Sequence, residues 1–177
     1  MGAVLMLPLF VITSCSKTKQ LAAFDVFYTF PKIYFSYAPK DQKLPEVTIY
    51  TGKLAINFDS ILNANYIPSG IIASAYLSRL AMVITAPPEA TFNWLESVRM
   101  VGSADSTFQQ ITELGSDTAI DPGARSINLV LNKVDIKPIL FKNSYYLRIL
   151  ATPSGQIPAS SISMYLDSQV KLHIEPL

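Results

Sequence analysis

The fold class is decided near the C-terminus, by the stretch SISMYLDSQVKLHI at residues 161–174. Large apolar side chains stand at almost every even position, and polar or charged side chains fill the odd positions. A period of two held over such a length predicts a β-strand with one face packed and the other in water. The apolar face consists of Ile162, Met164, Leu166, Val170, Leu172 and Ile174.

Several shorter segments upstream also have the composition of strands. They are rich in β-branched and aromatic residues and are bounded by turn-forming residues, among the twelve prolines and seven glycines of the chain. The segment 24–37 is divided by Pro31 and is expected to form an edge strand or two short strands. The expected strands are 24–37, 47–58 with a bend at Gly52, 76–85, 98–101, 108–114, 127–131, 145–151 and 161–174.

Only residues 135–142 have the signals of a helix. Asp135 is suited to cap the first amides, Pro138 fits the first turn, and Lys142 lies at the negative end of the helix dipole. The chain is therefore expected to be all-β, an antiparallel immunoglobulin-like β-sandwich of seven to eight strands with one short crossover helix. The paired cysteines of true immunoglobulin domains are absent, so the expectation concerns architecture only.

Composition narrows the classes of function. Half of the 177 residues are hydrophobic, which indicates a packed core and argues against disorder. The net charge is only +1, and the basic residues are scattered along the chain instead of clustered. No nucleic-acid partner is therefore expected. The single cysteine excludes an internal disulfide framework. No linker divides the chain, and residues 22–177 are expected to form one domain.

The N-terminus carries a processing signal. An apolar run, residues 3–13, has the length of the central part of a signal peptide, and it leads into Ile12-Thr13-Ser14-Cys15. This ending resembles the bacterial lipobox, in which the cysteine is lipidated and the peptide before it is removed. The resemblance implies a signal peptide at 1–14, lipidation of Cys15 and a tether at 15–21, with acyl chains that hold the protein on a membrane.

Two features bear on this interpretation. No Lys or Arg precedes Lys17, although signal peptides begin with basic residues. Either the α-amino group supplies the positive charge alone, or translation starts upstream of Met1. The alternative is an uncleaved first strand in which Cys15 is an ordinary buried residue. The chain resembles small β-sandwich lipoproteins of the Bacteroidetes, in which acidic residues after the cysteine accompany surface export. Residues 16–21 contain none, so an outer-membrane anchor facing the periplasm is expected.

Little in the chain indicates catalysis. His173 is the sole histidine and falls on the polar face of the last strand, where a solvated surface residue is expected. Asp117 and Asp121 lie in a turn-rich loop, and turn formation explains them better than calcium binding. We find no glycine-rich phosphate loop, nucleophile elbow or paired-cysteine metal site. No enzyme activity, cofactor or metal is therefore expected.

The aromatic run at residues 24–37 is the one candidate binding feature of the sequence. Aromatic rings stack on sugars and pack against protein partners, and tyrosines add a hydrogen-bonding tip. The alternative, which we favour, is that most of these rings fill the core, as is also expected for Trp94. The candidate contact residues are Phe24, Phe27, Tyr28, Tyr34 and Tyr37.

The sequence thus predicts a non-catalytic, membrane-anchored lipoprotein of the cell envelope. Its expected role is that of a binding or structural subunit, with an outer-membrane protein complex as partner. The alternative is a carbohydrate-binding or adhesive module that uses exposed aromatic side chains.

Overall fold

The computed structural model describes residues 22–38, 45–54, 58–64, 66–142, 145–156, 158 and 160–175. The expected signal peptide, Cys15 and the tether lie outside these residues. The described elements are β1 (Phe24–Thr29), β2 (Ile33–Tyr37), β3 (Val47–Leu54), α1 (Phe58–Ala64), η1 (Ser69–Ile71), β4 (Ile72–Ala86), β5 (Leu95–Ser103), β6 (Thr112–Asp117), β7 (Ser126–Asn128), β8 (Val130–Leu131), α2 (Lys137–Leu140), β9 (Tyr145–Pro153) and β10 (Ile162–Ile174).

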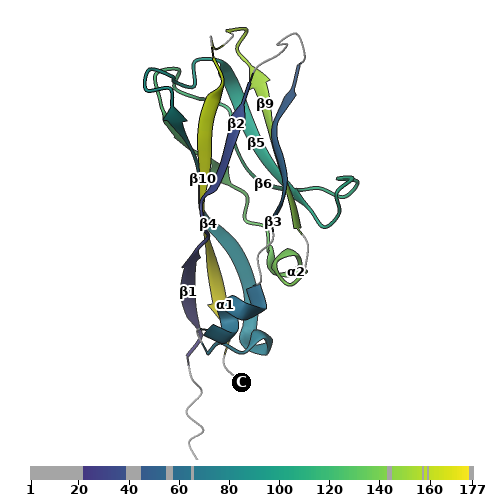
Figure 1. Cartoon of the computed structure of the whole chain (residues 1–177). Coiled ribbons are helices and arrows are strands. Elements are labelled where there is room, and N and C mark those ends of the chain that lie inside the picture. The colour runs from purple at the N-terminus through teal and green to yellow at the C-terminus, as the bar shows by residue number, and fades with distance from the viewer. Residues whose placement is uncertain are drawn as a thin grey trace, which may run out of the picture.

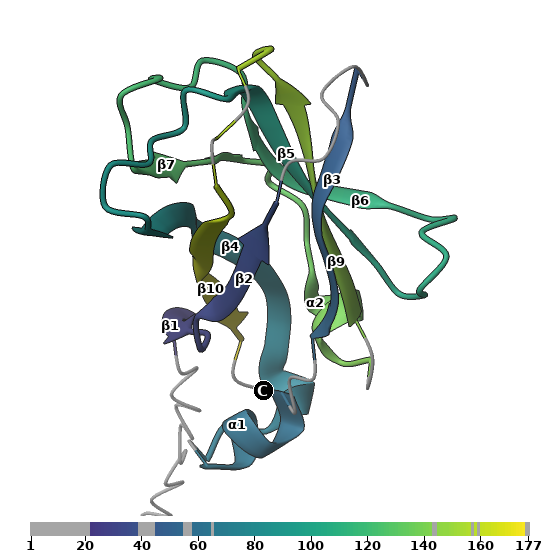
Figure 2. The same cartoon turned by 45° about the horizontal axis from the view of Figure 1, so that its top comes forward.

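The strands form two antiparallel five-stranded sheets packed face to face (Figures 1 and 2). Sheet A has the order β1-β10-β4-β7, with β2 also paired to β10, and sheet B has the order β3-β9-β5-β6-β8. The pairs β1–β10, β3–β9, β4–β7 and β5–β6 are nested along the chain. Nested pairs of this kind, rolled over two sheets, are the arrangement of a jelly roll. The expected all-β antiparallel sandwich is therefore present.

The C-terminal strand organises sheet A as its periodicity predicts. The even-numbered side chains of β10 from Ile162 to Leu166 and from Val170 to Ile174 are buried, and the odd ones are half-exposed. One side of β10 pairs with β4 over most of its length. The other side pairs with β2 along 162–166 and with β1 along 169–174. The first aromatic segment is thus two short edge strands separated at Pro31, as expected.

The strand count differs from the prediction because one expected strand is shared between the sheets. In the alternating segment 127–131, Ile127 pairs with β4 in sheet A, while Val130 and Leu131 pair with β6 in sheet B. The amide of Leu129 donates to the carbonyl of Leu80 at 2.9 Å at the crossing point. With the division at Pro31, the described residues hold ten strands instead of seven to eight.

Two of the expected strands were misassigned at their ends. Strand β3 ends at Leu54, and Phe58 begins α1 instead of continuing the strand. Phe58 and Leu62 are each 2% exposed, and their spacing of four places both on one helical face. Strand β6 begins at Thr112, not at Phe108, and extends through Asp117 into the segment expected to be a loop. Phe108 instead adopts a positive φ of 57° in the preceding turn.

Sheet A is longer than sheet B, and this difference positions the helices. Strands β4 and β10 have 15 and 13 residues, whereas no strand of sheet B has more than nine. The overhanging end of sheet A is covered by α1, and α2 lies where sheet B ends (Figure 1). The helix expected at 135–142 is present but shorter, because α2 covers only Lys137–Leu140. Asp135 precedes it and accepts from the amide of Lys137 at 2.9 Å.

The core fills the space between the sheets, and Trp94 lies within it. Its side chain is 1% exposed and stacks on Tyr37 with ring centroids 5.1 Å apart and planes inclined by 16°. Phe92, also fully buried, lies on the same segment before β5. The expectation that Trp94 is a core residue is confirmed.

A candidate ligand cavity between the sheets

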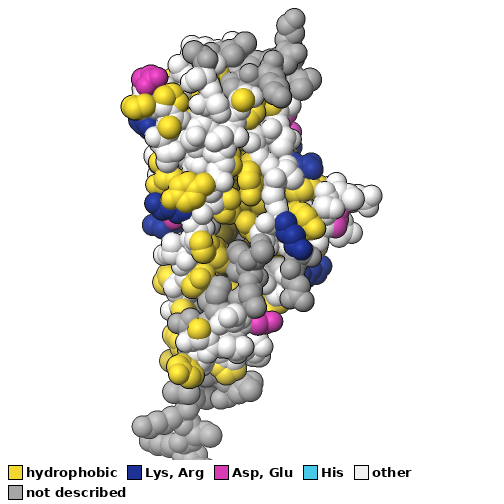
Figure 3. Space-filling model, in the orientation of Figure 1, with side chains coloured by type: hydrophobic (Ala, Val, Ile, Leu, Met, Phe, Trp, Pro, Cys, Tyr) yellow, Lys and Arg dark blue, Asp and Glu magenta, His cyan; other side chains and the backbone are white. Residues whose placement is uncertain are grey.

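A cavity of about 350 Å³ lies between the two sheets, on the side where β2 and β3 form their edges. Leu77, Leu80 and Leu166 of sheet A face Met100, Leu114 and Leu147 of sheet B across it. Its volume lies within the range of small-molecule sites. Figure 3 shows hydrophobic side chains gathered in a hollow along the boundary between the sheets, with Lys and Arg side chains on either side.

Two glycines on the inner face of sheet B help to leave this space open. An ideal Cβ at Gly102 would lie 1.3 Å from Oη of Tyr145, and one at Gly52 would lie 2.0 Å from Oη of Tyr50. Each ring therefore lies flat along the sheet, where the missing side chain gives it room. Tyr50 and Tyr145 line the cavity as part of its wall instead of filling it.

Helix α2 and the residue before it close one side of the cavity with Ile136, Ile139 and Leu140. Asp135 fixes this segment to β4, because its Oδ1 accepts from the amides of Ala75 and Lys137, both at 2.9 Å. The amide of Ile136 also donates to the carbonyl of Ala75 at 2.8 Å. A four-residue helix is too short to be stable alone, so these bonds hold its apolar side chains in place.

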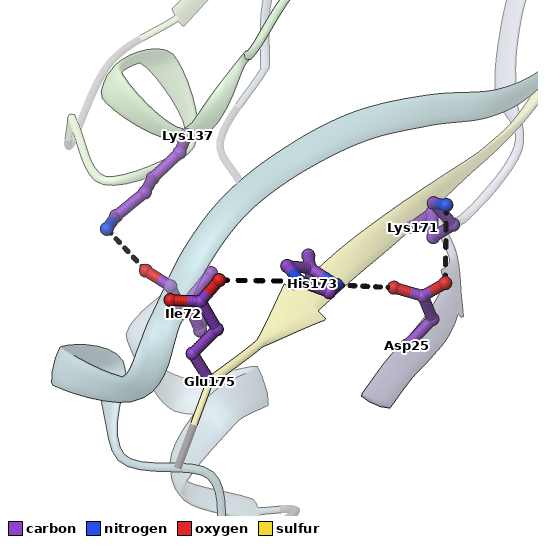
Figure 4. A network of polar contacts seen from close by, with 6 residues as sticks. All are labelled: Asp25, Ile72, Lys137, Lys171, His173 and Glu175. Atoms are coloured by element: carbon purple, nitrogen blue, oxygen red, sulfur yellow. Dashed lines mark hydrogen bonds and ion pairs between the residues drawn. The ribbon is translucent and has the colours of Figure 1, made fainter. Parts of the chain in front are cut away.

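The same segment has a second attachment to β4. The ammonium of Lys137 donates to the carbonyl of Ile72 (Figure 4). Helix α2 is thus fixed to the strand that also supplies Leu77 and Leu80 to the cavity. The wall formed by α2 and the wall formed by sheet A are therefore expected to keep a constant separation.

The charge in the described part of the cavity wall comes from lysine. Among the described residues, Lys32 and Lys53 are the charged residues of the lining, and both are exposed. The ammonium of Lys32 lies 4.1 Å from the ring centroid of Tyr165, on the outer face of sheet A. Within the described residues Lys53 has no hydrogen bond or ion pair. The positive charge of the described lining therefore comes from these two residues, and Lys53 holds the less engaged ammonium because that of Lys32 lies over the outer face of sheet A.

The chemistry of the described wall supports binding. No Asp, Glu or His belongs to the lining formed by the described residues. Burial raises the pKa of Tyr145 well above its ordinary value, so the phenol stays neutral at physiological pH. Its Oη has no hydrogen-bond partner in the described part of the chain. A neutral, apolar wall of this kind stabilises a bound apolar molecule by excluding water.

The aromatic residues singled out in the sequence do not gather at one place. Phe24, Phe27 and Tyr34 are 49%, 56% and 68% exposed. Tyr28 and Tyr37 are half-buried and pack against the core, Tyr28 with its ring centroid 5.3 Å from that of Phe30.

The two outward rings on sheet A are far apart. Phe27 lies opposite Lys171 of β10, and Tyr34 lies opposite Tyr165. Six residues along a strand span about 20 Å. The ring of Tyr34 is also inclined by 54° to its neighbour Tyr165. The outer face thus presents separate aromatic side chains and no single flat platform.

A polar cluster joins β1 to β10 on the outer face. His173 Nδ1 lies 2.9 Å from Asp25 Oδ1 and its Nε2 lies 3.6 Å from Glu175, while Lys171 Nζ lies 3.3 Å from Asp25 Oδ2 (Figure 4). The hydrogen bond with His173, followed by that with Lys171, lowers the pKa of the Asp25 carboxyl. All four side chains are more than a third exposed. The expected surface position of His173 is confirmed.

The two aspartates weighed for calcium have turn-forming contacts. Asp117 Oδ1 accepts from the amide of Ala119 at 3.0 Å, and Asp121 Oδ1 accepts from the amide of Gly123 at 2.9 Å. Each bond reaches two residues along the chain, the pattern by which aspartate stabilises a turn. In the part of the chain that the structure describes, no three His, Cys, Asp or Glu residues are grouped as metal ligands.

Comparisons with known proteins are limited to overall shape. No family model and no curated protein matches the chain. A chain of desmodium yellow mottle tymovirus is 15% identical, with coverage of 100% of this chain and 97% of its own, at a TM-score of 0.32. The decameric BFDV capsid protein is 12% identical, with coverage of 86% and 98%, at 0.39. Such scores say nothing about what this chain does, and its fold is defined by its own strand order.

The helices of the described residues include none that is long and apolar enough to span a membrane. The cavity itself was not predicted from the sequence. The one signal pointing to it is a glycine within an apolar strand, at Gly52 and again at Gly102, which indicates a close approach of another group.

Proposed function

We propose that the protein is a non-catalytic binding protein of the cell envelope that holds a small apolar molecule between its two sheets. The observation that carries this proposal is the cavity of about 350 Å³, walled by leucine, isoleucine and methionine side chains. Each methylene group moved from water into such a wall contributes about 0.8 kcal/mol. Several buried methylenes are therefore needed to exceed the cost of association.

The lipobox-like ending at Cys15 supports the second part of the proposal, an acyl anchor at the outer membrane that faces the periplasm. An anchored binding protein stays near the membrane from which an apolar molecule comes. The outer face of sheet A, where Phe27 and Tyr34 are exposed, would serve for contact with a protein partner in a complex.

The proposal is tested with a neutral fluorescent probe, N-phenyl-1-naphthylamine. The full chain carrying Cys15→Ser, which blocks acylation, is expected to bind the probe saturably with increased emission. Leu77→Trp places an indole in the cavity and is expected to weaken probe binding by about tenfold or more, equal to 1.4 kcal/mol.

The matched control is Val130→Trp, which adds the same indole at a position that is 74% exposed and outside the cavity. Its affinity for the probe should equal that of the parent chain, and circular dichroism should show the same strand signal in all three. Equal affinity in the Leu77→Trp variant, or no saturable binding by the parent, would refute the proposal.

A second candidate function is that of a carbohydrate-binding or adhesive module. It is favoured by the exposure of Phe27 and Tyr34, at 56% and 68%. Stacking on a sugar chain gains most from rings that share a plane. Because these two rings lie opposite distant positions of β10, this candidate ranks below the cavity.

A further inference from the structure

We infer that the ligand of the cavity is a single-chain amphiphile with an anionic head, of the class of the medium-chain carboxylates. This inference rests on the proposed function, because it assigns a ligand class to the same cavity. The chain would lie between the sheets, and the carboxylate would meet Lys53 at the mouth.

Charge complementarity selects the sign of the head group. Lys32 and Lys53 are the charged residues of the described lining, and no carboxylate balances them there. A cationic ligand would meet two like charges, whereas an anion gains a charge-assisted hydrogen bond. Apart from Ser168 and the tyrosine hydroxyls the described inner lining is apolar, so the mouth is the place for a charged group, because burial of an unpaired charge is costly.

The contacts of the two lysines distinguish their roles. Lys32 is held over the ring of Tyr165 at 4.1 Å, so its ammonium already has an attractive partner. Lys53 follows Gly52 near the end of β3 and has no polar partner among the described residues. Lys53 is therefore assigned the head group, and Lys32 adds a weaker, longer-range attraction.

The volume of the cavity favours a ligand with one hydrocarbon chain over a ligand with two. A methylene fills roughly the volume that a water molecule takes in the liquid, about 30 Å³. The cavity of about 350 Å³ thus accommodates a chain of roughly ten to twelve carbons. A two-chain lipid would leave one chain outside. Dodecanoate is the probe that matches this size.

The test compares dodecanoate, dodecanol and dodecyltrimethylammonium by displacement of N-phenyl-1-naphthylamine, below the concentration at which each self-associates. The chain carrying Cys15→Ser is expected to bind dodecanoate about fivefold more tightly than dodecanol, with the cation weakest. The advantage of the carboxylate should shrink as salt is added, because exposed charges are screened.

Lys53→Gln is expected to weaken dodecanoate by about three- to fivefold and to leave dodecanol unchanged. Lys32→Gln should have a smaller effect, and Lys133→Gln, which removes an exposed lysine outside the lining, should have none. Equal affinity for dodecanoate and dodecanol, or an unchanged preference in Lys53→Gln, would overturn this inference and leave the proposed function in place. Failure of all three compounds to displace the probe would also overturn this inference, whereas the proposed function fails only if the probe itself does not bind saturably or binds Leu77→Trp with equal affinity.

Discussion

Replacement of Trp94 by alanine is expected to lower the free energy of unfolding by about 3–5 kcal/mol. The side chain is 1% exposed between the sheets and stacks on Tyr37, so its removal leaves a large void that the rigid strands cannot close. Its Nε1 has no hydrogen-bond partner in the described part of the chain, so the loss comes from packing alone.

Urea denaturation followed by circular dichroism measures this effect, since the variant lacks the only tryptophan of the chain. Trp94→Phe keeps an aromatic ring against Tyr37 and should lose less than half as much. Tyr66→Ala is the control at a position that is 94% exposed, and it should change stability by less than about 0.5 kcal/mol. A loss below 1 kcal/mol for Trp94→Ala would show that this ring is not part of the core.

Gly102→Ala is expected to destabilise the protein by about 1–3 kcal/mol. The new Cβ would lie 1.3 Å from Oη and 2.1 Å from Cζ of Tyr145, so the ring must leave the surface of the sheet, lose its present packing and turn into the cavity that it lines. The same change at Gly70, where nothing lies within 4 Å of the added Cβ, is the matched control and should be nearly neutral.

A double-mutant cycle connects this loss to the contact. Tyr145→Phe removes a hydroxyl that has no partner among the described residues and should cost little. Tyr145→Leu removes the ring, and in that background Gly102→Ala should cost much less than it does alone. Additive losses in the two substitutions would show that the ring does not lie over Gly102.

The sequence predicted the sandwich because its longest strands repeat a physical pattern. In β10 the alternation of apolar and polar residues holds on both sides of Ser168, so its inner and outer faces follow directly. Pro31 cannot donate a hydrogen bond, and the break between β1 and β2 follows from that. Asp135 and Pro138 likewise predicted α2, since their roles are local.

The sequence-based assignments were wrong where one residue pattern fits both a strand and a helix, or where residues distant in sequence decide which strands pair. Phe58 continues the alternation of Leu54, yet its spacing from Leu62 also suits a helix, and burial of that pair in α1 decided the outcome. The segment 127–131 alternates as one strand, but its halves pair with different sheets. The sequence of this segment does not indicate which sheet each half pairs with.

The candidate site was the least predictable feature. Its walls come from strands far apart in the sequence, and leucines that line a hollow look like leucines that fill a core. The aromatic run was visible, but its parity relative to β10 separates outward Phe27 and Tyr34 from inward Tyr28. A binding role for Lys53 could not be predicted from the sequence, because an exposed lysine at the end of a strand is common.

Binding of an apolar chain between the sheets can be observed in a crystal structure of the protein with 12-bromododecanoate, in which anomalous scattering locates the bromine. We expect bromine beside Met100, Leu114 and Leu147, with the carboxylate at Lys53. Bromine only on the outer face of sheet A, near Phe27 or Tyr34, or at no ordered position, would contradict it.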